Sequence, residues 1–228
     1  MSQIVGITAR CIQSEGGANE ERDCLSHDWW ELLSRLGVTP VLIPNRLPSY
    51  VDFLNSTGIT HLLLSGGNNL QPMPEEKVNF GDFYPQRDQV EIELLSHAEK
   101  EKIPVFGVCR GMQMINRYFG GGLSRSLSEY LSKSNPHVTS SHPVKILTPE
   151  MKQIIGSTLD VNSYHDQGIT RDQVASPLGI FALCDDNIVE GIYHPCIPIY
   201  AIMWHPERSH KAADQTYKLM EWWLNSYI

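Results

Sequence analysis

Long hydrophobic runs are missing from this chain of 228 residues. No apolar stretch approaches the ~20 residues that a membrane-spanning helix requires. The first residues also lack the basic and apolar segments of a secretory signal, because Met1 leads directly into strand-like residues. We therefore expect a protein of the cytoplasm that makes no membrane contact.

An excess of positive charge is absent as well. The chain has 18 lysine and arginine residues against 26 aspartate and glutamate residues, which gives a formal net charge of −8. A protein that binds nucleic acid through its phosphates needs a basic surface, and this composition argues against one. We therefore expect no nucleic-acid partner.

Cysteine is too scarce and too irregularly spaced for a disulfide framework. Its number is odd, whereas the frameworks of small secreted domains use even numbers of cysteines. The number and spacing of the cysteines are therefore typical of a protein of the reducing cytoplasm. The five residues are Cys11, Cys24, Cys109, Cys184 and Cys196.

Internal repeats and low-complexity tracts are also absent, so no such feature divides the chain. A chain of this length can bury roughly 70–75% of the surface of its unfolded form, which is enough for a sizeable core. We expect a single α/β domain over residues 1–228.

Short apolar runs alternate with helical patterns in the first part of the chain. Strands are expected at 4–8, 40–44 and 60–65, and helices at about 24–36 and 50–56. This alternation is typical of βαβ units and predicts a parallel sheet.

The remaining segments follow a different pattern. Residues 11–21 are polar and contain glycine, so a loop is expected there. A strand at 142–147 suggests a smaller antiparallel sheet, and residues 178–183 and 188–193 read as a hairpin. A closing helix is expected from about 211 to 227.

The stretch from Ile103 to Gln113 carries the clearest chemical signal. An apolar run short enough for a buried strand ends at Gly107-Val108-Cys109-Arg110-Gly111, and a helical pattern follows at once. Glycines two residues either side of a nucleophile permit a sharp turn from strand to helix. Cys109 would then lie at a helix N-terminus, where the macrodipole and unpaired N–H groups favour a thiolate. The alternative interpretation is a buried cysteine at a strand end.

A partner for this cysteine follows a second apolar run, at 198–204. The run ends at His205-Pro206-Glu207. A cysteine nucleophile needs a base within hydrogen-bond reach, and that base needs a third group that fixes its tautomer. His205 and Glu207 are two residues apart, which on an extended segment places them on one face. His165 is a competing candidate for the base.

Two strings in the sequence resemble those of a known family. Cys109-Arg110-Gly111-Met112-Gln113 and Asn162-Ser163-Tyr164-His165-Asp166-Gln167 are similar to strings of the class-I glutamine amidotransferases, and more closely of their γ-glutamyl hydrolase branch, the peptidase C26 type. The resemblance spans nearly the whole chain. It implies a flavodoxin-like three-layer α/β sandwich with a central, mostly parallel sheet.

The resemblance also implies a reaction, the hydrolysis of the γ-glutamyl amide bond of a small molecule. Cys109 would attack the γ-carbonyl carbon and form a thioester, His205 would transfer the proton, and Glu207 would orient His205. Water would then release glutamate. This chemistry requires no metal and no organic cofactor.

A glycine pair, Gly66-Gly67, follows the strand expected at 60–65. Glycine lets backbone donors approach a reacting carbonyl without an intervening side chain. By the resemblance, we expect an oxyanion hole formed by N–H groups at Gly67 and Arg110. Outside this context, Gly-Gly-Asn-Asn is an ordinary turn signal.

The resemblance places further residues at the substrate. Gln113 shares a helix face with Cys109, and Arg87 opens an Arg-Asp-x-x-Glu string found near the substrate in similar hydrolases. Arg87 has an equally good alternative, an ion pair with Glu91 at i,i+4. The substrate-binding residues expected by resemblance are Gln113, His165, Arg87, Gly66, Ser163 and Tyr164.

His137 and His142 are five residues apart, which makes them candidates for metal binding. No third soft ligand lies near them in the sequence, so we expect no metal and interpret both as substrate contacts or surface residues. Glu190 faces the site in some relatives of the resembled family, but a solvated strand glutamate fits equally well.

Two functions of other kinds stay open. The chain could be a glutaminase subunit that delivers ammonia to a separate synthase, although its elbow reads Cys-Arg-Gly-Met-Gln rather than the Cys-x-Gly-His-Gln common in such subunits. It could also be a catalytically silent binding partner with the same fold, which an intact set of Cys109, His205 and Glu207 disfavours.

The sequence leaves the leaving group and the assembly undecided. The amine could be γ-aminobutyrate, another amine, a peptide or a nucleotide amidate, since the family-like strings concern the γ-glutamyl half of the substrate. A homodimer is compatible with the closing helix, because Trp222 and Trp223 would pack either on the sheet or at a dimer surface.

Overall fold

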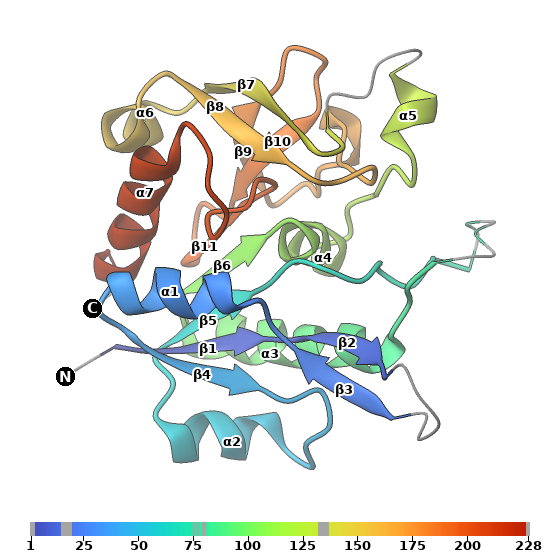
Figure 1. The fold of residues 1–228 in the computed structure, drawn as a ribbon, viewed down its shortest axis with the longest axis vertical. Coiled ribbons are helices and arrows are strands. Elements are labelled where there is room, and N and C mark those ends of the chain that lie inside the picture. Colours follow the sequence, from blue (N-terminus) through green and yellow to red (C-terminus); the bar gives the residue numbers. More distant parts are fainter. Residues whose placement is uncertain are drawn as a thin grey trace.

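The computed structural model describes residues 3–14, 20–74, 76, 78, 81–131 and 137–226. Within these residues, nine strands form one sheet in the order β4-β1-β5-β6-β11-β10-β9-β7-β8 (Figure 1). Five neighbouring strands are parallel: β4 Thr39–Ile43, β1 Ile4–Thr8, β5 His61–Leu64, β6 Val105–Val108 and β11 Ile199–Ile202. The others continue the sheet in antiparallel pairing: β10 Val189–Tyr193, β9 Gly179–Leu183, β7 Ser140–Ile146 and β8 Thr158–Ser163.

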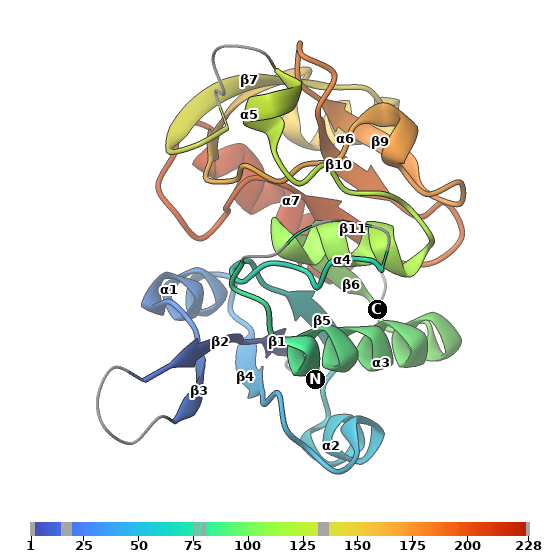
Figure 2. The same cartoon turned by 90° about the vertical axis from the view of Figure 1, so that its right-hand side faces the viewer.

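Helices cover both faces of the sheet, with α1 and α3 on opposite sides of the strands (Figure 2). In one layer, α3 packs against α2 and α4. In the other, α7 packs against α6 and against α1, where the Tyr217 hydroxyl donates a hydrogen bond to the Arg35 carbonyl at 2.8 Å. The helices are α1 His27–Arg35, α2 Tyr50–Thr57, α3 Pro85–Glu101, α4 Arg110–Tyr118, α5 Leu127–Tyr130, α6 Pro149–Ile155 and α7 Ala213–Asn225, with a 3-10 turn at Arg171–Gln173.

Local capping signals account for the limits of the first two helices. The Ser26 hydroxyl accepts a hydrogen bond from the N–H of Asp28, so α1 begins later than its apolar pattern suggests. Ser49 caps α2 in the same way through the N–H of Asp52, and α2 ends at Gly58 with φ 67°. Glycine adopts this left-handed conformation without the steric cost of a Cβ atom.

The core lies between the sheet and its two helix layers. Strands β5 and β6 are buried along their whole length, as expected for central parallel strands covered on both faces. Trp204 and Trp223 are fully buried, and the Trp223 ring lies 5.3 Å from that of Phe106. Burial of each large apolar side chain contributes roughly 1.5–3 kcal/mol. Trp223 therefore belongs to the core, whereas the partly buried Trp222 packs edge-on against Tyr200.

The structure confirms the expected three-layer α/β sandwich with a mostly parallel sheet. Two expectations about its elements are wrong. The antiparallel strands form no separate smaller sheet, because β10 pairs with β11 and so continues the main one. Residues 11–21 are more than a loop, since β2 Arg10–Gln13 pairs with β3 Glu21–Cys24; residues 15–19 of the expected loop lie outside the described residues.

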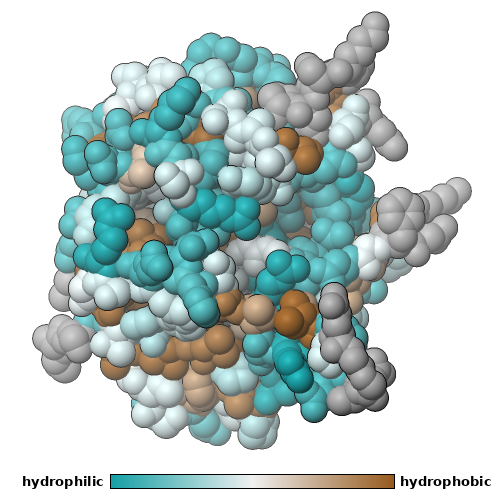
Figure 3. Space-filling model, viewed as in Figure 1, coloured by the Kyte–Doolittle hydropathy of each residue, from teal (hydrophilic) through white to brown (hydrophobic). Residues whose placement is uncertain are grey.

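Figure 3 shows a largely hydrophilic face with a band of hydrophobic surface at the level of β4, between α1 and α2. β4 is an edge strand, and its residues Pro40, Val41 and Leu42 are each partly exposed. Among the helices that the structure describes, none combines the length and the apolar character needed to cross a membrane.

Candidate active site

Cys109 occupies a strained turn between β6 and α4. Its backbone has φ 53° and ψ −105°, and such a conformation costs on the order of 1–3 kcal/mol in a residue other than glycine. The flanking glycines make the turn possible. A Cβ atom at Gly111 would lie 2.1 Å from the carbonyl oxygen of Leu64, and one at Gly107 would lie 2.8 Å from the carbonyl carbon of Gly111. The turn therefore has the elbow geometry that the sequence predicts.

His205 and Glu207 follow β11, directly beside this turn. Nδ1 of His205 is 2.7 Å from Oε1 of Glu207, and both side chains are buried. Burial disfavours the imidazolium, but the charge of the Cys109 sulfur, a hydrogen bond to it and the Glu207 carboxylate together raise the pKa of His205 to about 9. The sulfur, the imidazole and the carboxylate thus form one connected series.

Asn162, at the end of β8, fixes the backbone of His205. Its Oδ1 accepts a hydrogen bond from the His205 N–H at 2.8 Å, and its Nδ2 donates to the His205 carbonyl at 2.9 Å. Sequence reasoning placed Asn162 in a family-like string but gave it no role. No local pattern distinguishes an amide that bonds a residue 43 positions away.

The loop after β5 brings Gly66 and Gly67 to the reactive side chains. A Cβ atom at Gly66 would lie 3.5 Å from Cβ of Cys109, so a side chain at this position would contact the nucleophile. Gly67 has φ 81°, a left-handed conformation that favours glycine. The pair therefore packs more closely on the site than residues with side chains could.

Arg87 holds this loop from the protein interior. Its fully buried guanidinium donates hydrogen bonds to the carbonyl oxygens of Ser65 at 2.8 Å, Gly66 at 3.0 Å and Gly67 at 2.5 Å. In a planar trans peptide the N–H points away from the C=O, so the N–H of Gly67 points away from Arg87. Arg87 also pairs with Glu91 at 3.1 Å, the alternative that its sequence spacing suggested. The structure thus places Arg87 beneath the loop.

Glu91 joins Arg87 to Arg110 in a buried charge network. The Arg110 side chain donates hydrogen bonds to Glu91 and Asp88, and Glu91 also accepts one from the Thr8 hydroxyl at 2.9 Å. Burial disfavours the Glu91 carboxylate, but the charges of Arg110 and Arg87 outweigh burial and lower its pKa. The Arg110 side chain therefore faces the interior, while its backbone N–H lies in the first turn of α4.

Cys109 and His205 open into a cleft of about 840 Å³. Of the residues expected at the substrate, Gln113, Tyr164 and His165 line this cleft. The amide of Gln113 donates a hydrogen bond to the carbonyl of Gln167 at 3.0 Å, and Nδ1 of His165 lies 3.1 Å from the same carbonyl oxygen. The side chains of Gln113 and His165 are therefore both positioned by the Gln167 carbonyl group.

Tyr164 and Ser163 take different positions although they are adjacent. Tyr164 is 40% exposed, and its ring packs edge-on against His205 with 5.6 Å between ring centroids. The Arg208 guanidinium lies over the Tyr164 ring, 4.2 Å from its centroid. Ser163 is fully buried and donates a hydrogen bond to the carbonyl of His137 at 2.8 Å. Ser163 is therefore buried behind the residues that line the cleft.

Arginines outnumber acidic residues in the described lining of the cleft. Asp82 lies 3.6 Å from Arg10, and both side chains are about half exposed. Asp166 is bonded to the hydroxyls of Ser126 and Ser128. The lining arginines are Arg10, Arg125 and Arg208, together with Arg110, whose side chain pairs with Asp88 and Glu91 in the interior; the lining aspartates are Asp82 and Asp166.

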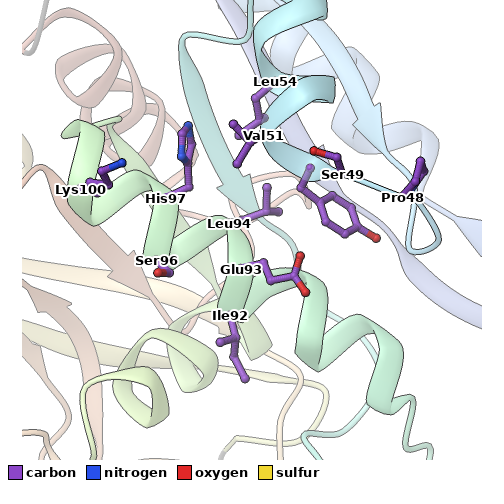
Figure 4. Close-up of a pocket in the computed structure, with 11 residues that line it drawn as sticks. Pro48, Ser49, Val51, Leu54, Ile92, Glu93, Leu94, Ser96, His97 and Lys100 are labelled. Carbon is purple, nitrogen blue, oxygen red and sulfur yellow. The ribbon is translucent and has the colours of Figure 1, made fainter.

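A second hollow, of about 540 Å³, lies between α2 and α3 (Figure 4). Val51, Leu54 and Ile92 line it together with His97. Its described lining includes no cysteine and none of the residues around Cys109. It is therefore separate from the site around Cys109.

The fold is that of the class-I glutamine amidotransferases. A solved structure of a glutamine amidotransferase from Thermotoga maritima matches it with a TM-score of 0.64 and 12% sequence identity, over 97% of this chain and 83% of that chain. Residues 3–207 match the family described as Peptidase C26, and the chain belongs to this family.

The names of two relatives of this chain specify a γ-glutamyl compound. It is 29% identical to the γ-glutamyl-CDP-amidate hydrolase of Campylobacter jejuni, over 96% of each chain. It is also 29% identical to the γ-glutamyl-γ-aminobutyrate hydrolase of Escherichia coli O157:H7, over 90% of this chain and 85% of that protein. Together with the family match, these relatives support a glutamine amidotransferase-like hydrolase.

Proposed function

We propose that this protein hydrolyses the γ-glutamyl amide bond of a small γ-glutamyl compound, with Cys109 as the nucleophile. The observation that carries the proposal is the connected series of Cys109, His205 and Glu207 at a strained strand-to-helix turn. A thiolate beside an imidazolium is the reactive form of such a series. The raised pKa of His205 favours the imidazolium.

In the first half of the reaction, the Cys109 sulfur attacks the γ-carbonyl carbon, and the carbonyl electron pair moves onto the oxygen. When this tetrahedral intermediate collapses, the C–N bond breaks and the His205 imidazolium gives its proton to the departing amine. The product that stays bound is a γ-glutamyl thioester of Cys109. Glu207 stabilises the imidazolium and keeps its ring in one orientation.

In the second half, a water molecule gives a proton to the neutral imidazole of His205 as its oxygen attacks the thioester carbonyl. The C–S bond breaks, glutamate leaves, and Cys109 returns as a thiolate beside the imidazolium. The two hydrogen bonds between Asn162 and the backbone of His205 keep the base in the same place in both steps.

The oxyanion of each tetrahedral intermediate would be held by the N–H groups of Gly67 and Arg110. Two features support this assignment. Arg87 binds the carbonyl of Gly66, which turns the N–H of Gly67 away from the interior. The N–H of Arg110 belongs to the first turn of α4, whose N–H groups have no partner within the helix. A pair of fixed donors of this kind contributes to rate through electrostatic stabilisation.

The rim of the cleft favours a leaving amine that carries an acidic group. Arg10 and Arg208 line the cleft, and their side chains are 46% and 41% exposed. Guanidinium groups bind both carboxylates and phosphates. The names of the two relatives described above specify their substrates as γ-glutamyl-γ-aminobutyrate and γ-glutamyl-CDP-amidate. The first leaving group has a carboxylate and the second has phosphates, so both are acidic.

A matched pair of substrates tests the proposal. Glutamate release is measured with γ-glutamyl-γ-aminobutyrate and with γ-glutamyl-n-butylamide, which has the same carbon chain without the carboxylate. We expect a higher kcat/KM for the acidic compound, and the difference should shrink in Arg208→Gln. The control variant is Arg35→Gln, an exposed arginine on α1. γ-Glutamyl-CDP-amidate and free glutamine complete the panel.

The same panel separates the competing functions. If glutamine is the best substrate, or becomes a good one only when a synthase is added, the chain is a glutaminase subunit instead. If no compound releases glutamate while the protein is folded, the silent binding partner is the better description. Trapping a γ-glutamyl adduct on the Cys109 peptide by acid quench and mass spectrometry supports the thioester directly.

A further inference from the structure

A cluster of buried ligand-type side chains lies in the antiparallel half of the sheet. It consists of His137, His142 of β7, Cys184 after β9 and Glu190 of β10, and all four side chains are buried. One ligand atom from each residue lies within 4.8 Å of the ligand atoms of the other three. We propose that these four residues bind a zinc ion, at a site distinct from the series around Cys109.

The donor set fits zinc. Imidazole nitrogen, thiolate sulfur and carboxylate oxygen are its usual protein ligands, four of them in a tetrahedral arrangement. Metal–ligand bonds of 2.0–2.1 Å place nitrogen and oxygen ligands roughly 3.3–3.5 Å apart. Oε1 of Glu190 is 3.4 Å from Nδ1 of His137 and 3.9 Å from Nε2 of His142. Small side-chain movements would complete the tetrahedron.

The carboxylate of Glu190 lies within reach of three histidine side chains. It is fully buried, and neither oxygen has a hydrogen-bond partner among the residues that the structure describes. Its contacts with histidine nitrogens are 3.4–3.9 Å long, whereas charge-assisted hydrogen bonds are about 2.7–2.9 Å long. A buried carboxylate needs a counter-charge. In the metal-free chain the neighbouring histidines interact favourably with it, and a divalent cation at the centre of the cluster would replace these interactions.

The charges at the site also balance. On binding, the Cys184 thiol releases its proton to solvent, and the resulting thiolate and the Glu190 carboxylate neutralise the two charges of zinc. The two histidines bind as neutral rings. Nε2 of His137 is 3.0 Å from Oδ2 of Asp186, which leaves Nδ1 for the metal. Carboxylates that hold the second nitrogen of a histidine ligand are typical of zinc sites.

Four protein ligands make a closed site, which indicates a structural role and not a second catalytic centre. The site connects β7, β9 and β10 next to the cleft wall, because Nε2 of His165 is 3.6 Å from Oε1 of Glu190. The spacing of His137 and His142 made them candidates for metal binding, but the absence of a third soft ligand near them in the sequence argued against a metal. The strand pairing brings Cys184 and Glu190 to them from more than 40 residues away, as the 3.3 Å contact between Cys184 and His142 shows.

Metal content tests the proposal without reference to turnover. The protein is produced without a histidine tag, equilibrated with zinc chloride, desalted and analysed by mass spectrometry of the metal. We expect one zinc ion per chain in the unmodified protein, and loss of this zinc in His142→Asn and Cys184→Ser. Cys196→Ser, which alters an exposed cysteine, should keep it. Because Cys109→Ala should bind zinc equally well, failure of the proposed reaction and failure of the metal site are distinguishable.

Cobalt supplies a second readout in the unmodified chain, so the proposal stays testable if a variant does not fold. Cobalt(II) bound by a thiolate has a sulfur-to-metal charge-transfer band in the near ultraviolet. We expect this band on titration of the zinc-free protein, its displacement by zinc, and its survival in Cys196→Ser. A chain that takes up neither ion tightly, or whose bound cobalt lacks the band, overturns the proposal.

Discussion

Gly66 lies against the imidazole of His205, so that a Cβ atom at Gly66 would be 3.0 Å from Cε1 and 3.8 Å from Nδ1 of the ring. We expect Gly66→Ala to displace the imidazole from Cys109. Misplacement of a catalytic group by about 1 Å costs on the order of 10²-fold in rate, so kcat should fall by about that factor with little change in KM. Gly122→Ala, which meets only the Gln173 side chain, is the control.

Cys109→Ala removes the proposed nucleophile and leaves a small residue at the turn. Turnover should disappear, because no thioester can form. The melting temperature should change little, since only one sulfur atom is lost. A clean preparation that keeps more than a trace of activity would show that the reaction is not covalent at Cys109. Iodoacetamide should label Cys109 much faster than the other four cysteines.

His205→Asn and His165→Asn separate the two candidate bases. Loss of His205 should lower kcat by roughly 10²–10⁴-fold or more, as expected for a general base. Loss of His165, which lines the cleft and bonds the carbonyl of Gln167, should chiefly raise KM. Steady-state kinetics with one γ-glutamyl amide decide between them, and the reverse pattern would exchange their roles.

The pH profile of Glu207→Gln tests the third member of the series. With a pKa of about 9, His205 keeps its proton below that pH and loses it above, so kcat/KM should fall on the alkaline side near pH 9. Removal of the Glu207 carboxylate takes away a stabilising charge and should move this limb to lower pH. An unchanged limb would exclude Glu207 from this role.

The same pKa has a consequence for folding. Because the folded-state pKa of His205 lies above the ordinary value of about 6.5, the imidazolium favours the folded state. This contribution is fully present below about pH 6.5 and is lost as the pH rises toward 9. Arg208 lies 3.7 Å from Glu207 and places a positive charge at this end of the series.

Much of the site could be read from the sequence because its parts are local strings. The glycines around Cys109 specify a turn between a strand and a helix, and two residues separate His205 from Glu207. The structure brings these three side chains together, while their catalytic roles stay predictions. The fold followed from the same logic, since apolar runs alternating with helical patterns specify a parallel sheet.

The parts that the sequence did not reveal depend on long-range pairing. The role of Asn162 requires knowing that β8 ends beside His205, and no short pattern contains that information. The position of Arg87 could not be predicted, because its i,i+4 spacing to Glu91 fits both an ion pair and a substrate contact. The burial of its side chain decides between the two. The hairpin of β2 and β3 was missed because its charged residues show no alternation of apolar and polar side chains.

The register of β6 and β11 has a consequence for how this protein can change. Val108 pairs with Ile202, and the N–H of Cys109 donates a hydrogen bond to the carbonyl of Ile202 at 2.8 Å. The backbone ladder therefore joins the turn that carries the nucleophile to the strand that leads to the base, while Gly66 and Asn162 complete the placement of the imidazole. Loops that touch neither Cys109 nor His205 could be exchanged to select other amides, while the reactive pair keeps its spacing. For an engineer or for natural selection, specificity and chemistry in this scaffold are separate variables.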